Sequence, residues 1–247
     1  SLAIRAGRSR VTLQCLPPAD FPAMNEGDLP HRFQIPATDL KGIIDRTRFA
    51  ISNEETRYYL NGIYFHSATA NGTAVLRGVA TDGHRLARVE VPLPKGAAEI
   101  PGVIVPRKTV GEVRKLLDES DGSVDVELSD TRIRFASGGV TLVSKLIDGT
   151  FPDYERVIPT GNDKVLNVPC KEFAHAVDRV STISTEKSRA IKLAVANGVV
   201  TLSATSPDAG SATEEIEVEY KAAALEIGFN SRYLLDIAEQ IAGSEAR

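Results

Sequence analysis

The sequence predicts an α+β fold built from repeated domains, each of which combines two helices with antiparallel strands. Three observations carry this prediction. Segments of the chain recur with an offset of about 130 residues. Short β-branched stretches of alternating polarity are separated by turn dipeptides. Two amphipathic helical patterns interrupt the strands of each repeat without alternating strictly with them, which disfavours a doubly wound parallel sheet.

The repeat is clearest where a hydrophobic-Pro pair leads into a helical pattern with Asp-Arg near its end. This pattern covers residues 35–46 and again residues 168–179. The stretch that follows, 51–57, resembles 183–189. Two shorter matches have nearly the same offset: 11–13 with 140–142, and Phe21-Pro22 with Phe151-Pro152.

The common offset predicts the domain organisation. Residues 1–30 form the C-terminal end of one domain, 31–159 a complete middle domain, and 160–247 a third domain that lacks its last strands. The chain begins at Ser1 and its only methionine is Met24, so we expect a segment of a longer protein.

The predicted strands of the middle domain have the alternation of half-buried antiparallel strands. They span residues 60–66, 74–80, 86–91, 123–128, 131–136 and 140–146. Turn dipeptides occur at Asn61-Gly62, Asn71-Gly72, Asp82-Gly83, Gly138-Gly139 and Asn197-Gly198.

Four helical patterns are amphipathic, one after Pro36 and the others at about 106–119, 170–181 and 230–242. Basic residues stand outside the apolar stripes of the first two: Lys41, Arg48, Arg107, Lys108, Arg114 and Lys115. Such faces are either solvated surfaces or surfaces that contact phosphates without reading base sequence. The fourth helix weakens the second interpretation, because Asp236 and Glu239 accompany Arg232.

The composition excludes several classes of protein. Hydrophobic residues make up 42% of the chain and charged residues 25%, a normal balance for a globular protein. No apolar run approaches the roughly 18 residues that a membrane span requires. We expect no signal peptide and a cytoplasmic location. Cys15 and Cys170 are too far apart in sequence to suggest a disulfide scaffold or a thiolate zinc site. The net charge of −4 argues against a protein that coats nucleic acid, but it permits local basic surfaces.

The densest motif is ATDGHRLA, residues 80–87. Asp82-Gly83 between two strand patterns predicts a tight hairpin turn. Asp82 and His84 are also the residue types of a catalytic base and its orienting partner. No nucleophile elbow, phosphate loop or dinucleotide fingerprint accompanies them, and the other histidines lack metal-ligand spacing. These observations favour a turn that presents polar groups to a partner, and we expect no cofactor and no metal.

Two further stretches have alternative interpretations. Residues 57–60 place two tyrosines beside an arginine at a helix-to-strand junction, which predicts either edge packing or a contact with DNA or a partner. Residues 151–159, FPDYERVIP, lie at the repeat boundary with prolines near both ends. This segment is either a stiff linker or one wall of an inter-domain groove.

Together these motifs resemble the bacterial β sliding clamp family, the processivity subunit of the replicative DNA polymerase III. The resemblance rests on RYYLNG (57–62), ATDGHRLA (80–87), VPRK (105–108), FPDYERVIP (151–159) and EIGFN (226–230). It implies the DNA-clamp fold, in which two three-domain subunits join into a ring with their helices lining the hole. It also implies a non-catalytic protein that is held on duplex DNA by topology and reads no base sequence.

The resemblance implies three groups of site residues. DNA-facing positions fall on Arg57, Tyr58, Tyr59, Arg107, Lys108 and Arg114, to which the helical wheel adds Lys41 and Arg48. A pocket between the second and third domains falls on Leu60, Thr81, Gly83, His84, Arg85, Leu86, Pro152, Arg156, Val157, Asn230 and Tyr233. The contact of a homodimer falls on Arg8, Arg10, Val11 and Leu13 against Thr182, Ile183, Glu214 and Glu215.

The family's pocket takes short Gln-Leu-x-Leu-Phe-like tails. The partners it implies are the polymerase α subunit, the clamp loader, translesion polymerases and repair proteins. The apolar members of the set would form a slot for leucine and phenylalanine anchors, with His84 and Arg85 supplying polar groups at its mouth.

Two other functions remain open from the residues alone. One is a hydrolase that uses Asp82 and His84, and loss of turnover in a His84→Ala variant would support it. The other is a structural interaction module with no role on DNA. Neutralising Arg107, Lys108 and Arg114 together would then have no effect.

Overall fold

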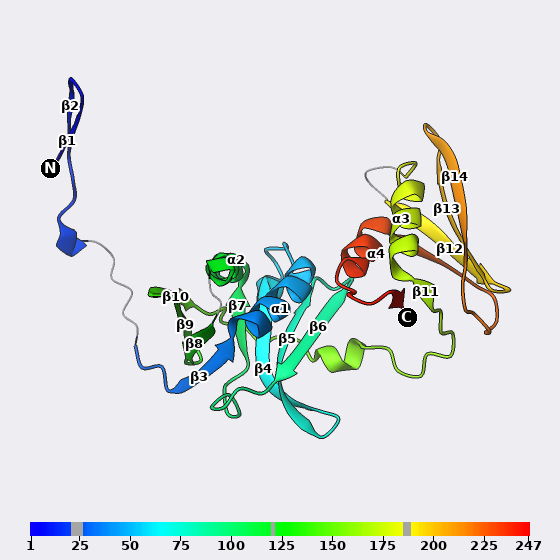
Figure 1. The fold of residues 1–247 in the computed structure, drawn as a ribbon, viewed down its shortest axis with the longest axis horizontal. Coiled ribbons are helices and arrows are strands. Elements are labelled where there is room, and N and C mark those ends of the chain that lie inside the picture. The colour runs from blue at the N-terminus through cyan, green and yellow to red at the C-terminus, as the bar shows by residue number, and fades with distance from the viewer. Residues whose placement is uncertain (21–26, 120–121, 185–188) are drawn as a thin grey trace.

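The computed structural model describes residues 1–20, 27–119, 122–184 and 189–247 of the 247-residue chain. The Phe21-Pro22 match, Met24 and part of the 183–189 match therefore lie outside the described residues. Figure 1 shows an N-terminal hairpin (Leu2–Leu13), a central unit (31–158) and a C-terminal unit (167–247). Within the described ranges, no helix combines the length and apolar character needed to cross a membrane.

The N-terminal hairpin pairs β1 (Leu2–Ala6) with β2 (Ser9–Leu13) and stands apart from both units in Figure 1. All its residues are exposed, including four large apolar side chains: Leu2, Ile4, Val11 and Leu13. A two-stranded hairpin is marginally stable by itself, so this apolar surface lacks the packing that would stabilise it.

Two four-stranded antiparallel sheets form the central unit. The first has the order β6-β5-β4-β7 and the second β10-β9-β8-β3. The strands of the first sheet are β4 (Gly62–Ala70), β5 (Thr73–Thr81), β6 (Leu86–Pro92) and β7 (Val103–Pro106). Those of the second are β3 (His31–Pro36), β8 (Ser123–Leu128), β9 (Arg132–Ser137) and β10 (Val140–Lys145). Helices α1 (Ala37–Thr47) and α2 (Arg107–Leu116) accompany them, which confirms the α+β prediction with antiparallel sheets.

The C-terminal unit repeats the first sheet of the central unit. Its sheet has the equivalent order β14-β13-β12-β15. The strands are β12 (Ala190–Ala196), β13 (Val199–Ser206), β14 (Gly210–Glu217) and β15 (Leu225–Asn230), with helices α3 (Cys170–Ser181) and α4 (Ser231–Ala238). The short pair β11 (Val168–Pro169) and β16 (Glu245–Ala246) takes the positions that β3 and β8 occupy in the central unit.

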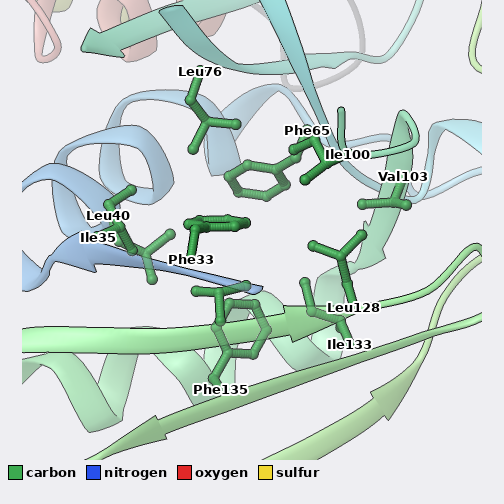
Figure 2. Close-up of a pocket in the computed structure, with 11 residues that line it drawn as sticks. Phe33, Ile35, Leu40, Phe65, Leu76, Ile100, Val103, Leu128, Ile133 and Phe135 are labelled. Carbon is green, nitrogen blue, oxygen red and sulfur yellow. The ribbon is translucent and has the colours of Figure 1, made fainter. Parts of the chain in front are cut away.

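The core of the central unit joins both sheets and both helices. Its buried members include Ile35 on β3, Ile43 on α1, Leu76 on β5 and Val113 on α2. Figure 2 shows Phe33 and Phe65 directed into the same small space, a cavity of about 20 Å³ lined only by apolar side chains. Because this lining offers water no hydrogen-bond partner, the cavity is a packing defect that stays dry.

The first sheet of the central unit buries residues on both faces. On β4, Ile63 and Phe65 point into the core, while Tyr64 and His66 alternate to the opposite face. The linker after β10 covers that second face through Phe151 and the short 3₁₀ helix η5 (Tyr154–Val157). This packing makes the linker part of the central unit and leaves its outer side free to form a wall.

Several boundaries differ from the sequence-based expectation. The strand predicted from residue 60 begins at Gly62, because Tyr58–Leu60 form the 3₁₀ helix η3. The Asn61-Gly62 pair is not a hairpin turn: Gly62 lies in β4, where a Cβ atom would come within 2.2 Å of the Val105 carbonyl oxygen. Helix α4 ends at Ala238, earlier than predicted.

Candidate functional site

A hollow of about 800 Å³ lies between the linker and the end of the first sheet of the central unit. Eight of the eleven residues predicted for the partner pocket line it: Leu60, Thr81, Gly83, His84, Arg85, Leu86, Pro152 and Val157. Seven further residues complete the lining: Arg57, Tyr59, Arg88, Asp153, Tyr154, Ile158 and Pro159. We call this hollow the linker pocket.

The turn between β5 and β6 shapes one side of the linker pocket. The Asp82 carboxylate accepts hydrogen bonds from the backbone N–H groups of His84 and Arg85, both at 3.0 Å. Gly83 adopts φ +87°, in the region that favours glycine. The result is a four-residue loop instead of the predicted tight turn, because Thr81 pairs with Leu86. The Asp82 carboxylate makes no hydrogen bond to the His84 ring, so the geometry gives no support to a catalytic pair.

Arg85 joins the two units next to the linker pocket. Its guanidinium donates to Asp82 Oδ2 at 3.2 Å and to the Phe49 carbonyl at 2.8 Å, and it also binds Asp236 on α4. The same group lies 4.5 Å from the centre of the Tyr233 ring. With a side chain only 13% exposed, Arg85 is held in this contact while it also lines the linker pocket, where the resemblance implies a polar group at the mouth.

Arg57 and Tyr59 were predicted to face DNA, but both line the linker pocket. Arg57 binds both carboxylate oxygens of Glu54 and donates to the Asp82 carbonyl at 3.0 Å. The hydrogen bond with Arg57 lowers the pKa of Glu54 and raises that of Arg57. A Cβ atom on Gly83 would lie 2.4 Å from Arg57 Nη1, so the flexible end of Arg57 would have to shift, and the positive φ would strain any other residue at this position.

The linker supplies the opposite wall. Val157 is 68% exposed, so its apolar side chain is available to a ligand, whereas Tyr154 of the same linker is buried. Three predicted pocket residues do not line the hollow. Arg156 points to solvent and pairs with Asp153 at 2.8 Å. Asn230 accepts a hydrogen bond from the Arg232 N–H as the N-cap of α4, and Tyr233 stacks beside His84 with ring centres 6.1 Å apart.

The residues missed by sequence reasoning were close to recognised motifs. Asp153, Tyr154, Ile158 and Pro159 belong to FPDYERVIP, for which the sequence alone leaves open a stiff linker or one wall of a groove. Arg88 has no comparable signal, since it continues the alternation of a strand.

A second hollow, of about 760 Å³, lies along α2. It brings together four of the predicted DNA-facing residues, Arg48, Tyr58, Arg107 and Lys108, and adds Lys115. Arg107 donates to the Ser52 carbonyl, and Lys115 pairs with Glu112 at 3.0 Å. Lys108 forms no ion pair with any described residue. We call this surface the basic hollow.

Lys41 and Arg114 lie in a separate ion-pair network. Arg114 binds Asp45 and Asp118, each at 2.6 Å, and Lys41 binds Asp118 at 2.9 Å. Hydrogen bonding to Arg114 lowers the pKa of Asp118, and hydrogen bonding to Asp45 raises the pKa of Arg114. These partners hold α1 against α2 and leave Arg114 less able to contact a phosphate than Lys108.

The predicted dimer residues fall on two separate surfaces. Arg8, Arg10, Val11 and Leu13 lie on the exposed hairpin. Thr182 and Ile183 follow α3, and Glu214 and Glu215 lie on β14, the last strand of its sheet. Glu214 already pairs with Arg179, whose hydrogen bond lowers the pKa of Glu214.

Comparison with known proteins gives a consistent result along the chain. Residues 34–153 match the family described as DNA polymerase III beta subunit, central domain, and residues 155–247 match its C-terminal domain. The beta sliding clamp of Caulobacter vibrioides is 54% identical over 99% of this chain, and that of Pseudomonas aeruginosa 44% over 100%. The chain spans 66% of the length of both relatives.

Solved structures agree with the sequence matches. A sliding clamp from Bartonella birtlesii bound to griselimycin superposes with a TM-score of 0.92 at 54% identity, covering 98% of this chain and 66% of that one. The Caulobacter crescentus clamp with PEG bound to a putative beta-motif tethering region gives 0.94 at 54% identity, covering 98% and 65%. The chain therefore belongs to the β sliding clamp family, the β subunits of DNA polymerase III.

Proposed function

We propose that the chain acts as part of a processivity factor, a ring that encircles duplex DNA and tethers other replication proteins through the linker pocket. The observation that carries the proposal is the pocket itself. Its volume of about 800 Å³ falls within the usual range for ligand sites. Leu60, Leu86 and Val157 give it an apolar lining, and His84 stands at its edge. This chemistry suits a short tail with leucine and phenylalanine anchors.

The partners proposed for the linker pocket are the tails of the polymerase α subunit, the clamp loader, translesion polymerases and repair proteins. All of them would present the same short motif, so one pocket would serve them in turn. No chemical step is involved, and the protein acts by holding its partner near the DNA.

The basic hollow is proposed to face the duplex. Three of its cations, Arg48, Arg107 and Lys108, carry charge without a built site for base edges, while Lys115 pairs with Glu112. Contacts of this kind are electrostatic and independent of sequence, as sliding requires.

The ring is proposed to close as a homodimer, with the hairpin of one subunit against β14 of the other. Among the strands that the structure describes, β14 pairs with β13 alone, so its outer edge is open to a further strand. Arg8 and Arg10 on the hairpin and Glu215 on β14 have opposite charges, which favours this contact.

The test is retention on DNA of the protein at its natural length, loaded by its clamp loader. Retention on circular DNA with rapid loss after linearisation is expected of a threaded ring. Equal retention on circular and linear DNA would indicate ordinary surface binding and would contradict the proposal. Absence of retention on both, with loading verified independently, would favour an interaction module without a DNA role.

A further inference from the structure

A buried arginine lies beneath the linker, outside the linker pocket. Arg77 projects from β5 with a side chain only 8% exposed. Its guanidinium binds Glu90 on β6 at 2.7 Å, and Glu155 and the Tyr154 hydroxyl on η5, the latter at 3.0 Å. A buried charge is tolerated only where such partners compensate for lost water, so the linker and Arg77 depend on each other.

His66 completes the contact from β4. Its Nδ1 lies 2.9 Å from the Ser67 carbonyl oxygen, which can only accept, so Nδ1 carries the proton. In the neutral ring Nε2 is then an acceptor, and it lies 3.0 Å from the Tyr154 hydroxyl. That hydroxyl therefore donates to His66 while accepting from Arg77. Burial lowers the pKa of His66 from 6.5, which favours this neutral form.

Tyr154 connects Arg77 and His66 to the wall of the linker pocket. Its ring packs on Phe151, which stacks on Tyr64 with ring centres 4.8 Å apart. The turn that begins at Tyr154 carries Val157 and Ile158, which line the linker pocket. Arg77 and His66 do not line it, so they act on a ligand through η5, by way of the Tyr154 hydroxyl and, for Arg77, also the Glu155 carboxylate.

We propose that Arg77 and His66 are positioning residues of the linker pocket, which hold its η5 wall in place through the Tyr154 hydroxyl. The inference rests on the proposed docking function of that pocket. It assigns a binding role to two residues that touch no ligand, and it identifies the linker as an ordered wall held from behind.

A pH dependence follows from the hydrogen-bond directions. Protonating His66 at Nε2 removes the acceptor for Tyr154 and places a second cation near Arg77. The groups that face or adjoin His66 are Tyr64 on β4, Arg77 on β5, Arg88 and Glu90 on β6, and Tyr154 and Glu155 on η5. Since the pKa of His66 is lowered, the loss sets in as the pH falls through a value below 6.5.

The experiment measures affinity for an acetylated, amidated peptide, Gln-Leu-Ser-Leu-Phe, which contains no titrating group. All variants carry His84→Gln, so that His66 is the histidine whose effect is compared next to the pocket. Tyr154→Phe removes only the shared hydroxyl. Tyr220→Phe is the matched control, because it removes a buried hydroxyl that donates to the Ala223 carbonyl in the C-terminal unit.

At about pH 7.5 we expect Tyr154→Phe to weaken binding about tenfold and Tyr220→Phe to leave it within about twofold. Acidification to about pH 5 should weaken binding in the His84→Gln background but much less in Tyr154→Phe. In His66→Gln, the amide oxygen can accept the Tyr154 hydrogen bond but cannot be protonated. This variant should therefore bind the peptide about as well at both pH values as the His84→Gln background does at about pH 7.5. Hydrogen exchange without peptide should be faster in residues 151–158 of Tyr154→Phe only.

The outcomes separate this inference from the function on which it rests. If the background binds the peptide and Tyr154→Phe matches its affinity and pH profile, the positioning role is wrong and the pocket stands. Unchanged hydrogen exchange in residues 151–158 would also overturn the role. If the protein that retains His84 binds no peptide at either pH, the proposed pocket fails and the inference fails with it.

Discussion

Arg85 connects the central and C-terminal units at the scale of single side chains. Arg85 and Asp236 are 151 positions apart in the sequence. Their side chains are 13% and 25% exposed, so the ion pair is shielded enough from solvent to matter. The adjoining Tyr233 ring lies against the same guanidinium. This contact sets how α4 meets the loop of the linker pocket.

A double-mutant cycle tests that contact. Arg85→Gln and Asp236→Asn should each lower the free energy of unfolding. The double variant should lower it by less than the sum of the two single effects. The expected coupling is about 1–3 kcal/mol, because each single change leaves one shielded charge unpaired. The measurement is urea denaturation of the four proteins. Strictly additive effects would show that the pair does not join the units.

Leu86 is the residue on which the linker pocket depends most directly. Leu86→Asp places a carboxylate in the apolar lining. It should weaken the affinity for the peptide by about 100-fold or more, equivalent to about 2.7 kcal/mol of binding free energy. The matched control is Leu16→Asp, the same change at a leucine that is 83% exposed on the N-terminal segment. Binding by calorimetry, with thermal melts of both variants, separates the two. Equal affinity of Leu86→Asp and the control would remove Leu86 from the site.

Residue roles were predictable where a motif concentrates them. The resemblance placed Leu60, Leu86 and Val157 together, and the structure brings them to one hollow. The position of Arg57 could not be settled in sequence, because its partner, the Asp82 carbonyl, belongs to a distant loop. Arg77 gave no signal at all, since a single cation in an alternating strand is usually solvated.

At the scale of elements, two glycines differ in the space that a Cβ atom would find around them. Gly42 lies in α1, and a Cβ atom there would meet no heavy atom within 4 Å. Gly42→Ala should therefore stabilise the protein by about 0.5–1 kcal/mol, through the higher helix propensity of alanine. Gly62→Ala should destabilise it, because the Cβ atom would meet the Val105 backbone at 2.2 Å. Urea midpoints of both variants check this, and a destabilised Gly42→Ala would contradict the open space around α1.

The elements themselves were largely predictable from periodicity and turn chemistry. At Asn71-Gly72, Gly138-Gly139 and Asn197-Gly198 both residues have positive φ, as type I′ hairpin turns require. The same reasoning failed at Asp82-Gly83, because the Asp82 carboxylate caps two backbone N–H groups and widens the loop. Side-chain capping of this kind depends on geometry that a dipeptide does not encode.

At the scale of the whole molecule, a net charge of −4 coexists with a local concentration of cations. Arg48, Arg107 and Lys108 share the basic hollow, and Arg48 also lies 3.7 Å from Asp45, whereas Arg114 pairs at 2.6 Å with both Asp45 and Asp118. The overall charge therefore says little about the surface offered to DNA. The grouping could be foreseen from the helical wheel, and so could the Arg114–Asp118 pair, because its i,i+4 spacing is that of helix neighbours. The pair with Asp45 could not, because Asp45 lies on another helix.

This distribution predicts how substitutions of the basic residues change the loading of the protein onto DNA. Arg48, Arg107 and Lys108 changed together to Gln should lower loading onto circular DNA and flatten its salt dependence. Each lost phosphate contact removes about 0.9 from the slope of log affinity against log salt, so three contacts remove up to about 2.7. The matched control changes Lys95, Lys164 and Lys221, which lie outside the hollow. Arg114→Gln should instead act mainly on stability, since it unpairs Asp45 and Asp118.

The measurement is loading efficiency and retention between about 50 and 200 mM salt. Loading depends on attraction between the open protein and the duplex, so it should respond strongly to the triple change. Retention on a closed circle depends on the ring itself, so a threaded clamp should keep its residence time there. If the triple variant instead left the circle as quickly as it leaves linear DNA, charge rather than topology would be holding the protein. A triple variant that matched its control in both quantities would place the duplex on another face.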